Sequence, residues 1–83
     1  MRQALRMMSV KQSNNFLRQR IALNIKRLRS EKSLSQEKLA ELADFHRTYI
    51  SQLERCVTNI SVDGLERIAQ ALNVDILELF RPV

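Results

Sequence analysis

The chain contains one cysteine and one histidine in 83 residues, and these scarcities exclude several kinds of stabilisation. A single cysteine, Cys56, cannot form an internal disulfide, and we interpret it as a packing or surface residue rather than a redox group. His46 lies ten residues from Cys56 with no second such pair, so no metal site is expected. A small domain without disulfides or metal commonly gains stability by self-association.

Glycine and proline are equally scarce, since Gly64 and Pro82 are the only residues of their kinds. The chain therefore has no glycine-rich loop for a phosphate and lacks the usual catalytic sets, so we expect neither a cofactor nor enzymatic activity. Aromatic residues are too few to form a platform that stacks RNA bases. With few helix breakers and many helix-forming residues, an all-α fold is predicted.

The chain also lacks an apolar run long enough to cross a bilayer and the apolar segment of a signal peptide. We therefore expect a cytoplasmic protein with no membrane partner. Its length suits one domain with a modest hydrophobic core.

Basic residues gather in the N-terminal part of the chain. The formal net charge is +5, from 14 basic and nine acidic residues. Residues 1–32 hold nine of the basic residues and one acidic residue, so the rest of the chain is acidic on balance. A positive surface attracts polyanions over about 10 Å at ordinary salt, and DNA is the commonest such partner. An ordinary solvated helix face would have the same composition.

Helix starts share one local pattern, the hydrophobic staple, in which two apolar residues five positions apart flank a capping residue. Four such pairs surround the candidate caps Ser35, His46, Ser61 and Asp75. Ser and Asp accept hydrogen bonds from free backbone N–H groups, whereas His caps poorly. Together with the apolar repeat of a first helix, the pattern predicts helices at about 15–32, 36–43, 47–54, 62–72 and 76–80. Residues 1–14 are predicted to be an N-terminal arm, either flexible or partly helical.

The predicted helix 47–54 has a polar face opposite its apolar stripe. At about 100° per residue, Ile50 and Leu53 fall together and define the buried side. The opposite side presents hydrogen-bonding side chains, namely Thr48, Ser51, Gln52 and, just beyond the helix, Arg55, while Arg47 lies on the flank of the first turn. Arg suits guanine, Gln suits adenine, and Thr can meet a thymine methyl group, so the row fits a helix that reads the DNA major groove. A plain solvated face is the alternative.

Glu54 is placed differently, because its angle turns it toward the neighbouring helices. A buried carboxylate needs a partner, and Arg29 near the end of the first helix is the one we predict. This pair would be structural rather than DNA-reading.

The run LSQEKLAELADFHRTYISQLER, residues 34–55, resembles the helix-turn-helix of the Cro and phage-repressor type, the XRE family. The resemblance covers about residues 21–80 and implies a compact five-helix repressor-like domain. Within the family, RTYISQLERCVTNIS is similar to the small controller proteins of restriction-modification systems.

The resemblance also implies roles for single residues. It places base edges against Arg47, Thr48, Ser51 and Gln52, and it supports the Arg29–Glu54 ion pair. Contacts to the DNA backbone are expected from Gln36, His46, Tyr49, Arg55, Asn59 and Ser61. The chain departs from the family pattern at Asp44 and Cys56, where glycine is usual, and at His46, where controller proteins usually have Asp.

The C-terminal helix carries more apolar surface than it can bury within one domain. We expect Ile76, Leu77, Leu79 and Phe80 to form a dimer interface, as this helix commonly does in the resembled family. A two-fold dimer would place two recognition helices about 34–36 Å apart on a pseudo-palindromic operator. The alternative is a self-contained fifth helix that caps a monomer.

These observations predict a homodimeric, sequence-specific transcriptional regulator that binds double-stranded DNA. Repression and activation both remain open, and activation would add RNA polymerase as a partner. The alternative is an antitoxin that binds a toxin protein, with the N-terminal arm as the binding segment, as well as its own promoter.

Overall fold

The computed structural model describes the backbone of residues 2–83 and the side chains from Phe16 onward. Its elements are α1 (Arg2–Glu31), α2 (Gln36–Ala43), α3 (Arg47–Glu54), α4 (Val62–Leu72) and a 3₁₀ turn, η1 (Ile76–Phe80). The predicted all-α class is confirmed, although the fifth element is a 3₁₀ turn instead of an α-helix. Among the described residues, no helix is both long and apolar enough to span a membrane.

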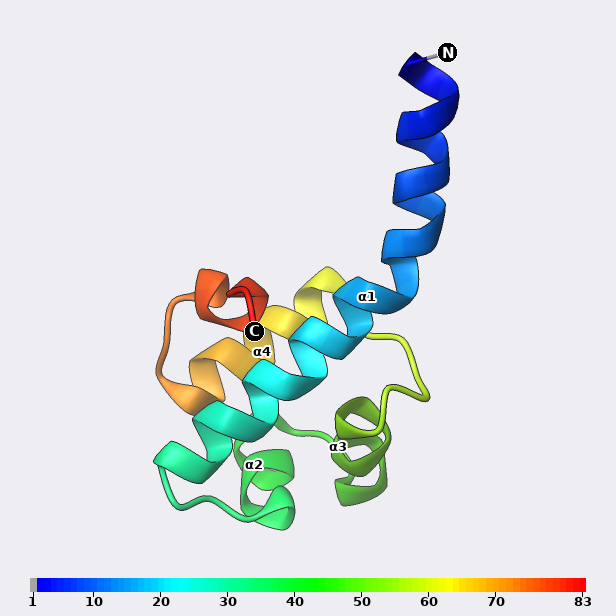
Figure 1. Cartoon of the computed structure of the whole chain (residues 1–83). Helices are drawn as coiled ribbons and strands as arrows, with labels where there is room; N and C mark the ends of the chain where they lie inside the picture. Colours follow the sequence, from blue (N-terminus) through cyan, green and yellow to red (C-terminus); the bar gives the residue numbers. More distant parts are fainter. Residues whose placement is uncertain (1) are drawn as a thin grey trace.

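The first helix begins at Arg2 instead of residue 15. Apolar periodicity indicates which residues face a core, and the first residues of the chain lack it. They nevertheless contain no Gly or Pro, so nothing in the backbone stops a helix from continuing. The N-terminal half of α1 projects away from the other helices (Figure 1). The binding role predicted for residues 1–14 depends on side chains outside the described part.

The predicted helix starts agree with the observed caps. Ser35, Ser61 and Asp75 each accept a hydrogen bond from a backbone N–H group, at 2.9 Å in every case. His46 occupies the corresponding position before α3 and makes no capping hydrogen bond through its side chain. At the start of α4, Ile60 is the apolar residue before the cap Ser61. Gly64 makes room for it, because a Cβ atom at Gly64 would lie 2.8 Å from Ile60 Cγ1.

Helix ends follow a second pattern, which is not evident from the sequence. After each α-helix one residue adopts a positive φ, and the next residue donates its N–H to the carbonyl five positions earlier at 2.8 to 3.0 Å. This is the Schellman motif, which normally uses glycine at the positive-φ position. Here the position is occupied by Ser33, Asp44, Cys56 and Asn73.

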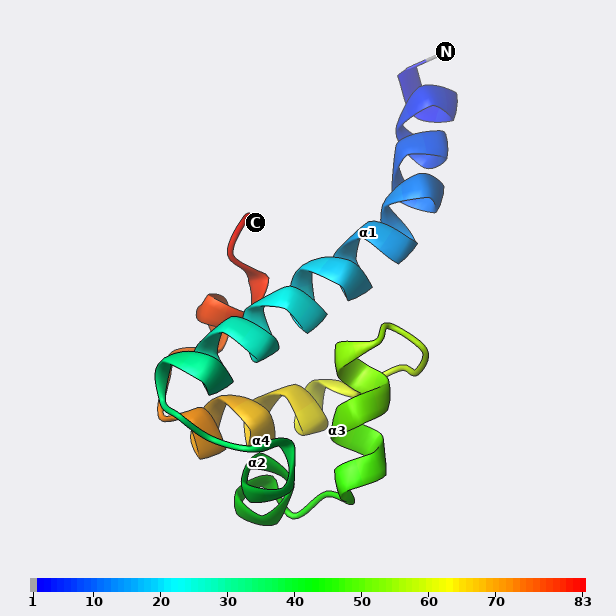
Figure 2. The same ribbon diagram turned by 60° about the horizontal axis from the view of Figure 1, so that its bottom comes forward.

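The core lies where the four helices and η1 meet (Figure 2). Its fully buried side chains include residues from every element, namely Ile25, Leu39, Ile50, Ile68, Leu72 and Leu79. α1 packs against α3 and η1, whereas α4 packs against α2 and η1. The pair α2 and α3 therefore rests on a scaffold of α1 and α4.

One polar residue of the core, Asn24, holds the C-terminal segment against α1. Its Nδ2 donates to the carbonyls of Leu79 at 3.0 Å and Arg81 at 2.8 Å, while its Oδ1 accepts from Arg27 at 3.1 Å. Since every polar group of Asn24 has a partner, its burial carries no desolvation penalty for an unpaired amide. η1 is thus fixed to its own protomer.

This arrangement corrects part of the predicted dimer interface. Leu79 is completely buried inside the protomer, so its side chain has no surface to offer a second copy. Ile76 and Phe80 are half-buried against the core, and Leu77 remains 69% exposed. The sequence pattern located an apolar turn but could not tell which residues of a 3₁₀ turn face inward.

Candidate nucleic-acid interface

Helix α3 has the two faces predicted from its sequence. Ile50 and Leu53 are buried in the core, while Arg47 and Thr48 are exposed and Ser51 and Gln52 are partly exposed. The four candidate base-reading residues thus lie on one short helix with access to solvent. A helix that presents hydrogen-bonding side chains along such a face fits the major groove.

A buried ion pair fixes the C-terminal end of α3. Arg29 donates from Nε to Glu54 Oε2 at 2.8 Å and from Nη2 to Oε1 at 3.0 Å, and its Nη1 bonds the Leu34 carbonyl at 2.9 Å. The Glu54 side chain is 1% exposed. The hydrogen bond to Glu54 is the main cause that raises the pKa of Arg29, against the opposing effect of burial. The predicted pair is therefore present, in the bidentate geometry that Arg and carboxylate favour.

Gln36, for which the family resemblance implies a contact with the DNA backbone, also belongs to this cluster. Its Nε2 donates to Glu54 Oε1 at 3.0 Å. The amide has a second N–H, so binding Glu54 leaves one donor for a phosphate. Gln36 at the start of α2 is consequently oriented by the same carboxylate that anchors α3. The sequence offered no signal for this contact because it joins residues 18 positions apart.

Tyr49 is tied to the loop that follows α3. Its hydroxyl donates to the Asn59 carbonyl at 2.6 Å, and its ring centroid lies 4.8 Å from that of Phe45. Burial raises the pKa of Tyr49, and the nearby Arg67 opposes this shift. Because the hydroxyl proton is already donated inside the protein, a phosphate, which only accepts, would have to compete with Asn59 for it.

The remaining candidates for backbone contact lie at the rims of α3 and α4. His46, Arg55, Asn59 and Ser61 are all exposed. Arg55 Nε reaches back to the Ser51 carbonyl at 3.4 Å. Ser61 Oγ already accepts from Gly64 N, which leaves its hydroxyl proton for an anion at the start of α4.

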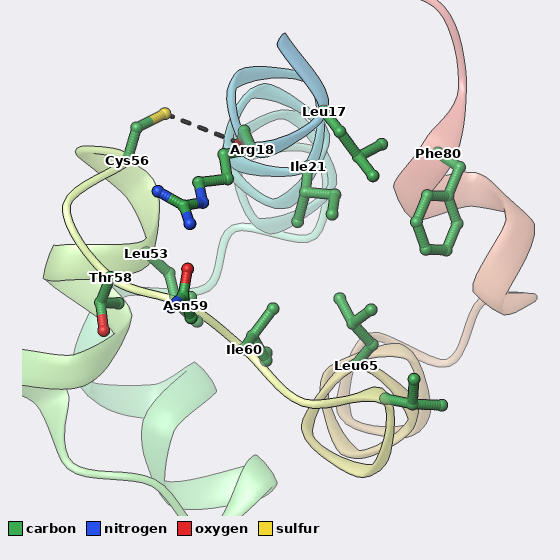
Figure 3. A pocket seen from close by; sticks show the side chains of 11 residues that line it. Leu17, Arg18, Ile21, Leu53, Cys56, Thr58, Asn59, Ile60, Leu65 and Phe80 are labelled. Carbon is green, nitrogen blue, oxygen red and sulfur yellow. Dashed lines mark hydrogen bonds between the residues drawn. The ribbon is translucent and has the colours of Figure 1, made fainter. Parts of the chain in front are cut away.

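An apolar hollow of about 410 Å³ lies beside this surface, between α1, the loop after α3 and the start of α4. Leu17, Ile21, Leu65 and Phe80 point into it (Figure 3). Its polar edge includes Cys56, whose Sγ donates to the Arg18 carbonyl at 3.6 Å. At the rim Val62 is 70% exposed, so apolar surface continues beyond the hollow.

The sequence did not lead us to predict the contacts of Asn24 and Arg67. A sequence signal existed for Asn24 but not for Arg67. Asn24 follows Ile21 by three positions and precedes Leu28 by four, so it falls on the apolar stripe of α1, where a polar residue indicates a specific partner. Arg67 bonds the turn between α2 and α3 from α4. No local pattern marks it, because its partners are 23 and 24 positions away.

Comparison with known proteins agrees with this geometry. A helix-turn-helix family model matches residues 25–79. The chain is 46% identical over 61 residues to control protein C.BamHI of Bacillus amyloliquefaciens, a match that covers 72% of this chain and 75% of that protein. It is 39% identical over 70 residues to control protein C.MunI of a Mycoplasma species, covering 83% and 95% respectively.

Solved structures give the same relationship. The restriction-modification controller protein C.AhdI from Aeromonas hydrophila has a TM-score of 0.74 at 35% identity, covering 76% of this chain and 96% of that one. The controller protein C.Esp1396I, solved as a tetramer in complex with its natural 35 base-pair operator, has a TM-score of 0.73 at 38% identity, covering 78% and 86%. The chain therefore belongs to the XRE-type helix-turn-helix family, with restriction-modification controller proteins among its relatives.

Proposed function

We propose that this protein is a sequence-specific DNA-binding transcriptional regulator that acts as a homodimer on a pseudo-palindromic operator. The observation that carries the proposal is the outward polar row of α3 on a helix whose end is fixed by the buried Arg29–Glu54 pair. A helix held in this way presents base-reading side chains in one orientation, as sequence discrimination requires. The relatives described above, which are controller proteins, are consistent with this function.

The proposal assigns the reading of bases to Arg47, Thr48, Ser51 and Gln52. Contacts to the DNA backbone are assigned to residues around them, namely the partly exposed Gln36 and Tyr49 and the exposed His46, Arg55, Asn59 and Ser61. It needs no cofactor and no catalytic step, and a regulator of this kind acts in the cytoplasm. The antitoxin alternative has no support, because the relatives described above are controllers.

Apolar residues that the protomer leaves exposed are the best candidates for the dimer surface. Leu77 is 69% exposed on η1 and Val62 is 70% exposed at the rim of the apolar hollow. A soluble domain gains by burying such groups against a second copy. We expect sedimentation at micromolar concentration to give a dimer. Leu77→Glu should shift it toward monomer, whereas Leu42→Glu, at an equally apolar position on α2, should not.

Selection of bound sequences from random DNA tests the function itself. We expect a pseudo-palindromic consensus whose half-sites lie about one helical turn apart. Arg47→Ala should weaken binding to that consensus by about 1 to 3 kcal/mol and relax the preference at one base pair. Equal losses on the consensus and on a random duplex would contradict the assignment of Arg47, and the absence of any consensus would contradict the proposed function.

A further inference from the structure

The turn between α2 and α3 is bonded from α4 by one side chain, Arg67. Its Nε donates to the Ala43 carbonyl at 2.9 Å and its Nη2 donates to the Asp44 carbonyl. Its Cζ lies 4.0 Å from the centroid of the Phe45 ring, within the range of a cation–π contact. Arg67 thus contacts three consecutive residues, the last residue of α2 and the first two residues of the turn that leads to α3.

These contacts add to the hydrogen bonding at the end of α2. The Schellman motif uses Phe45 N, bonded to the Ala40 carbonyl at 2.8 Å, and Asp44 N, bonded to the Glu41 carbonyl at 3.3 Å. Arg67 bonds two further carbonyls, those of Ala43 and Asp44. A cation is also favoured there, because the C-terminal end of a helix carries partial negative charge.

The chemistry of these contacts is specific to arginine. A planar guanidinium can donate to two carbonyls at once while its flat face lies over an aromatic ring. The ammonium of lysine has the same charge but is a compact point donor without a flat face. Replacement of Arg67 by lysine therefore keeps the positive charge but removes the paired hydrogen bonds to two carbonyls and the flat face that lies over the Phe45 ring.

From the turn the contacts continue into the recognition helix. Phe45, which lies under Arg67, packs against Tyr49 with 4.8 Å between ring centroids. Tyr49 directly follows Arg47 and Thr48, which form the exposed first turn of α3. The Arg29–Glu54 pair fixes the other end of the helix. Arg67 therefore acts at the end of α3 that the ion pair does not reach.

We propose that Arg67 is a positioning residue for base recognition, which holds the turn and the first turn of α3 in the orientation that reads the operator. Arg67 touches no base in this assignment and acts through Phe45 and Tyr49. The inference rests on the proposed operator binding, and it adds a residue of α4 to those that determine specificity.

The test compares Arg67→Lys with the wild-type protein on the selected operator and on a random duplex, well below the melting temperature of each. We expect Arg67→Lys to bind the operator about tenfold more weakly, the scale of one charged hydrogen bond, with unchanged affinity for the random duplex. Arg67→Met should do the same. The control is Glu66→Asp, an equally conservative change at the adjacent exposed position, which should bind as the wild type does.

Two results would overturn the proposal. One is that Arg67→Lys prefers the operator over the random duplex as strongly as the wild-type protein does. Arg67 would then be a structural residue with no role in base recognition. The other is that Arg67→Met binds both duplexes equally weakly, with the salt slope reduced by about 0.9, while Arg67→Lys binds as the wild type does. That pattern would describe a phosphate contact made by the charge of Arg67. Failure of the wild-type protein to prefer any sequence would count against the proposed function instead.

A measurement without DNA tests the same contact independently. We expect Arg67→Lys to accelerate hydrogen exchange of the Phe45 amide by about tenfold relative to wild type and Glu66→Asp, because the turn opens more often. Unchanged exchange at Phe45 would show that Arg67 does not hold the turn and would overturn the proposal whatever the DNA affinities are.

Discussion

At the scale of single residues, the ends of the four α-helices are unusual because none uses glycine. The φ angles at Ser33, Asp44, Cys56 and Asn73 lie between 55° and 62°. This region costs most residues about 1–2 kcal/mol, although Asn and Asp occupy it more readily than others. Ser33 and Cys56 therefore hold a conformation that their side chains oppose, and the hydrogen bonds of the Schellman motif stabilise it.

Glycine at Cys56 should consequently stabilise the protein. We expect the free energy of unfolding of Cys56→Gly to be about 1 kcal/mol higher than that of Cys56→Ala. Both variants lose the thiol contact, but only glycine adopts the positive φ without steric cost. In a domain of this size the difference corresponds to about 4–8 °C in melting temperature. Ala71→Gly, inside α4, should instead lower stability by about 1 kcal/mol. A Cys56→Gly variant no more stable than Cys56→Ala would contradict the argument.

Tyr49 offers a clean test of burial at another single residue, since the chain has one tyrosine and no tryptophan. Burial raises its pKa above the ordinary value of about 10. The folded state therefore favours the neutral phenol, so this contribution to stability is present below about pH 10 and is lost as the pH rises through the folded pKa.

We expect absorbance titration of the folded protein to show a phenolate midpoint above that of the urea-unfolded chain. The free energy of unfolding should also fall more steeply above pH 10 in the wild type than in Tyr49→Phe, which cannot ionise there. Equal midpoints in the folded and unfolded protein would show that the ring is not desolvated.

At the scale of elements, helix starts could be predicted from the sequence much better than helix ends. A cap at a start uses side chains within a few residues, so Ser35, Ser61 and Asp75 could be recognised from spacing alone. The ends depend on a backbone conformation that Ser and Cys rarely signal. The sequence left residues 1–14 open between a flexible and a partly helical arm, because they have no apolar period from which a helix start could be read.

In the candidate interface, too, some features could be predicted from the sequence and others could not. Helical angle alone identified the outward row of α3 and the inward Glu54, since both follow from position on one helix. The contacts of Gln36 with Glu54 and of Tyr49 with Asn59 depend on how separate elements pack, so the sequence could not supply them. The inward position of Leu79 in η1 also depends on packing between elements, so the sequence could not supply it either.

The buried pair that joins α1 to α3 should be far more important than any exposed pair. Arg29→Ala leaves the Glu54 carboxylate buried with only Gln36 as a partner, and we expect it to cost about 3–5 kcal/mol. The double variant Arg29→Met, Glu54→Met should recover most of this loss, because no buried charge remains. Lys38→Ala, which breaks the exposed Lys38–Glu41 pair, should cost about 0–1 kcal/mol.

Urea unfolding of the four proteins measures these differences directly. If Arg29→Ala were as stable as the wild type, Glu54 would have to reach solvent or another partner, contrary to the geometry of the pair.

At the scale of the whole molecule, the charge count overstates how much of the basic α1 is available to DNA. Arg29 is committed to Glu54, and Arg27 lies 3.2 Å from Glu31 and 3.9 Å from Glu78. Neutralised cations contribute little to the field beyond a Debye length. Among the described side chains of α1, Arg18 and Lys26 remain exposed, as does Lys32 just beyond the helix. The long-range attraction of DNA is therefore weaker than nine basic residues would imply.

One continuous helix connects the two parts on which operator binding depends. Asn24 of α1 holds η1, and Arg29, five residues later, holds α3. If the dimer forms through η1, the separation of its recognition helices is fixed by the rigidity of the protomer and not by a linker. We expect one base pair inserted between the half-sites to reduce binding in gel-shift titrations nearly to the level of random DNA. Retained affinity would mean that the two DNA-reading units adjust independently. Because the protomer is rigid, we expect this protein to tolerate changes in base sequence better than changes in spacing.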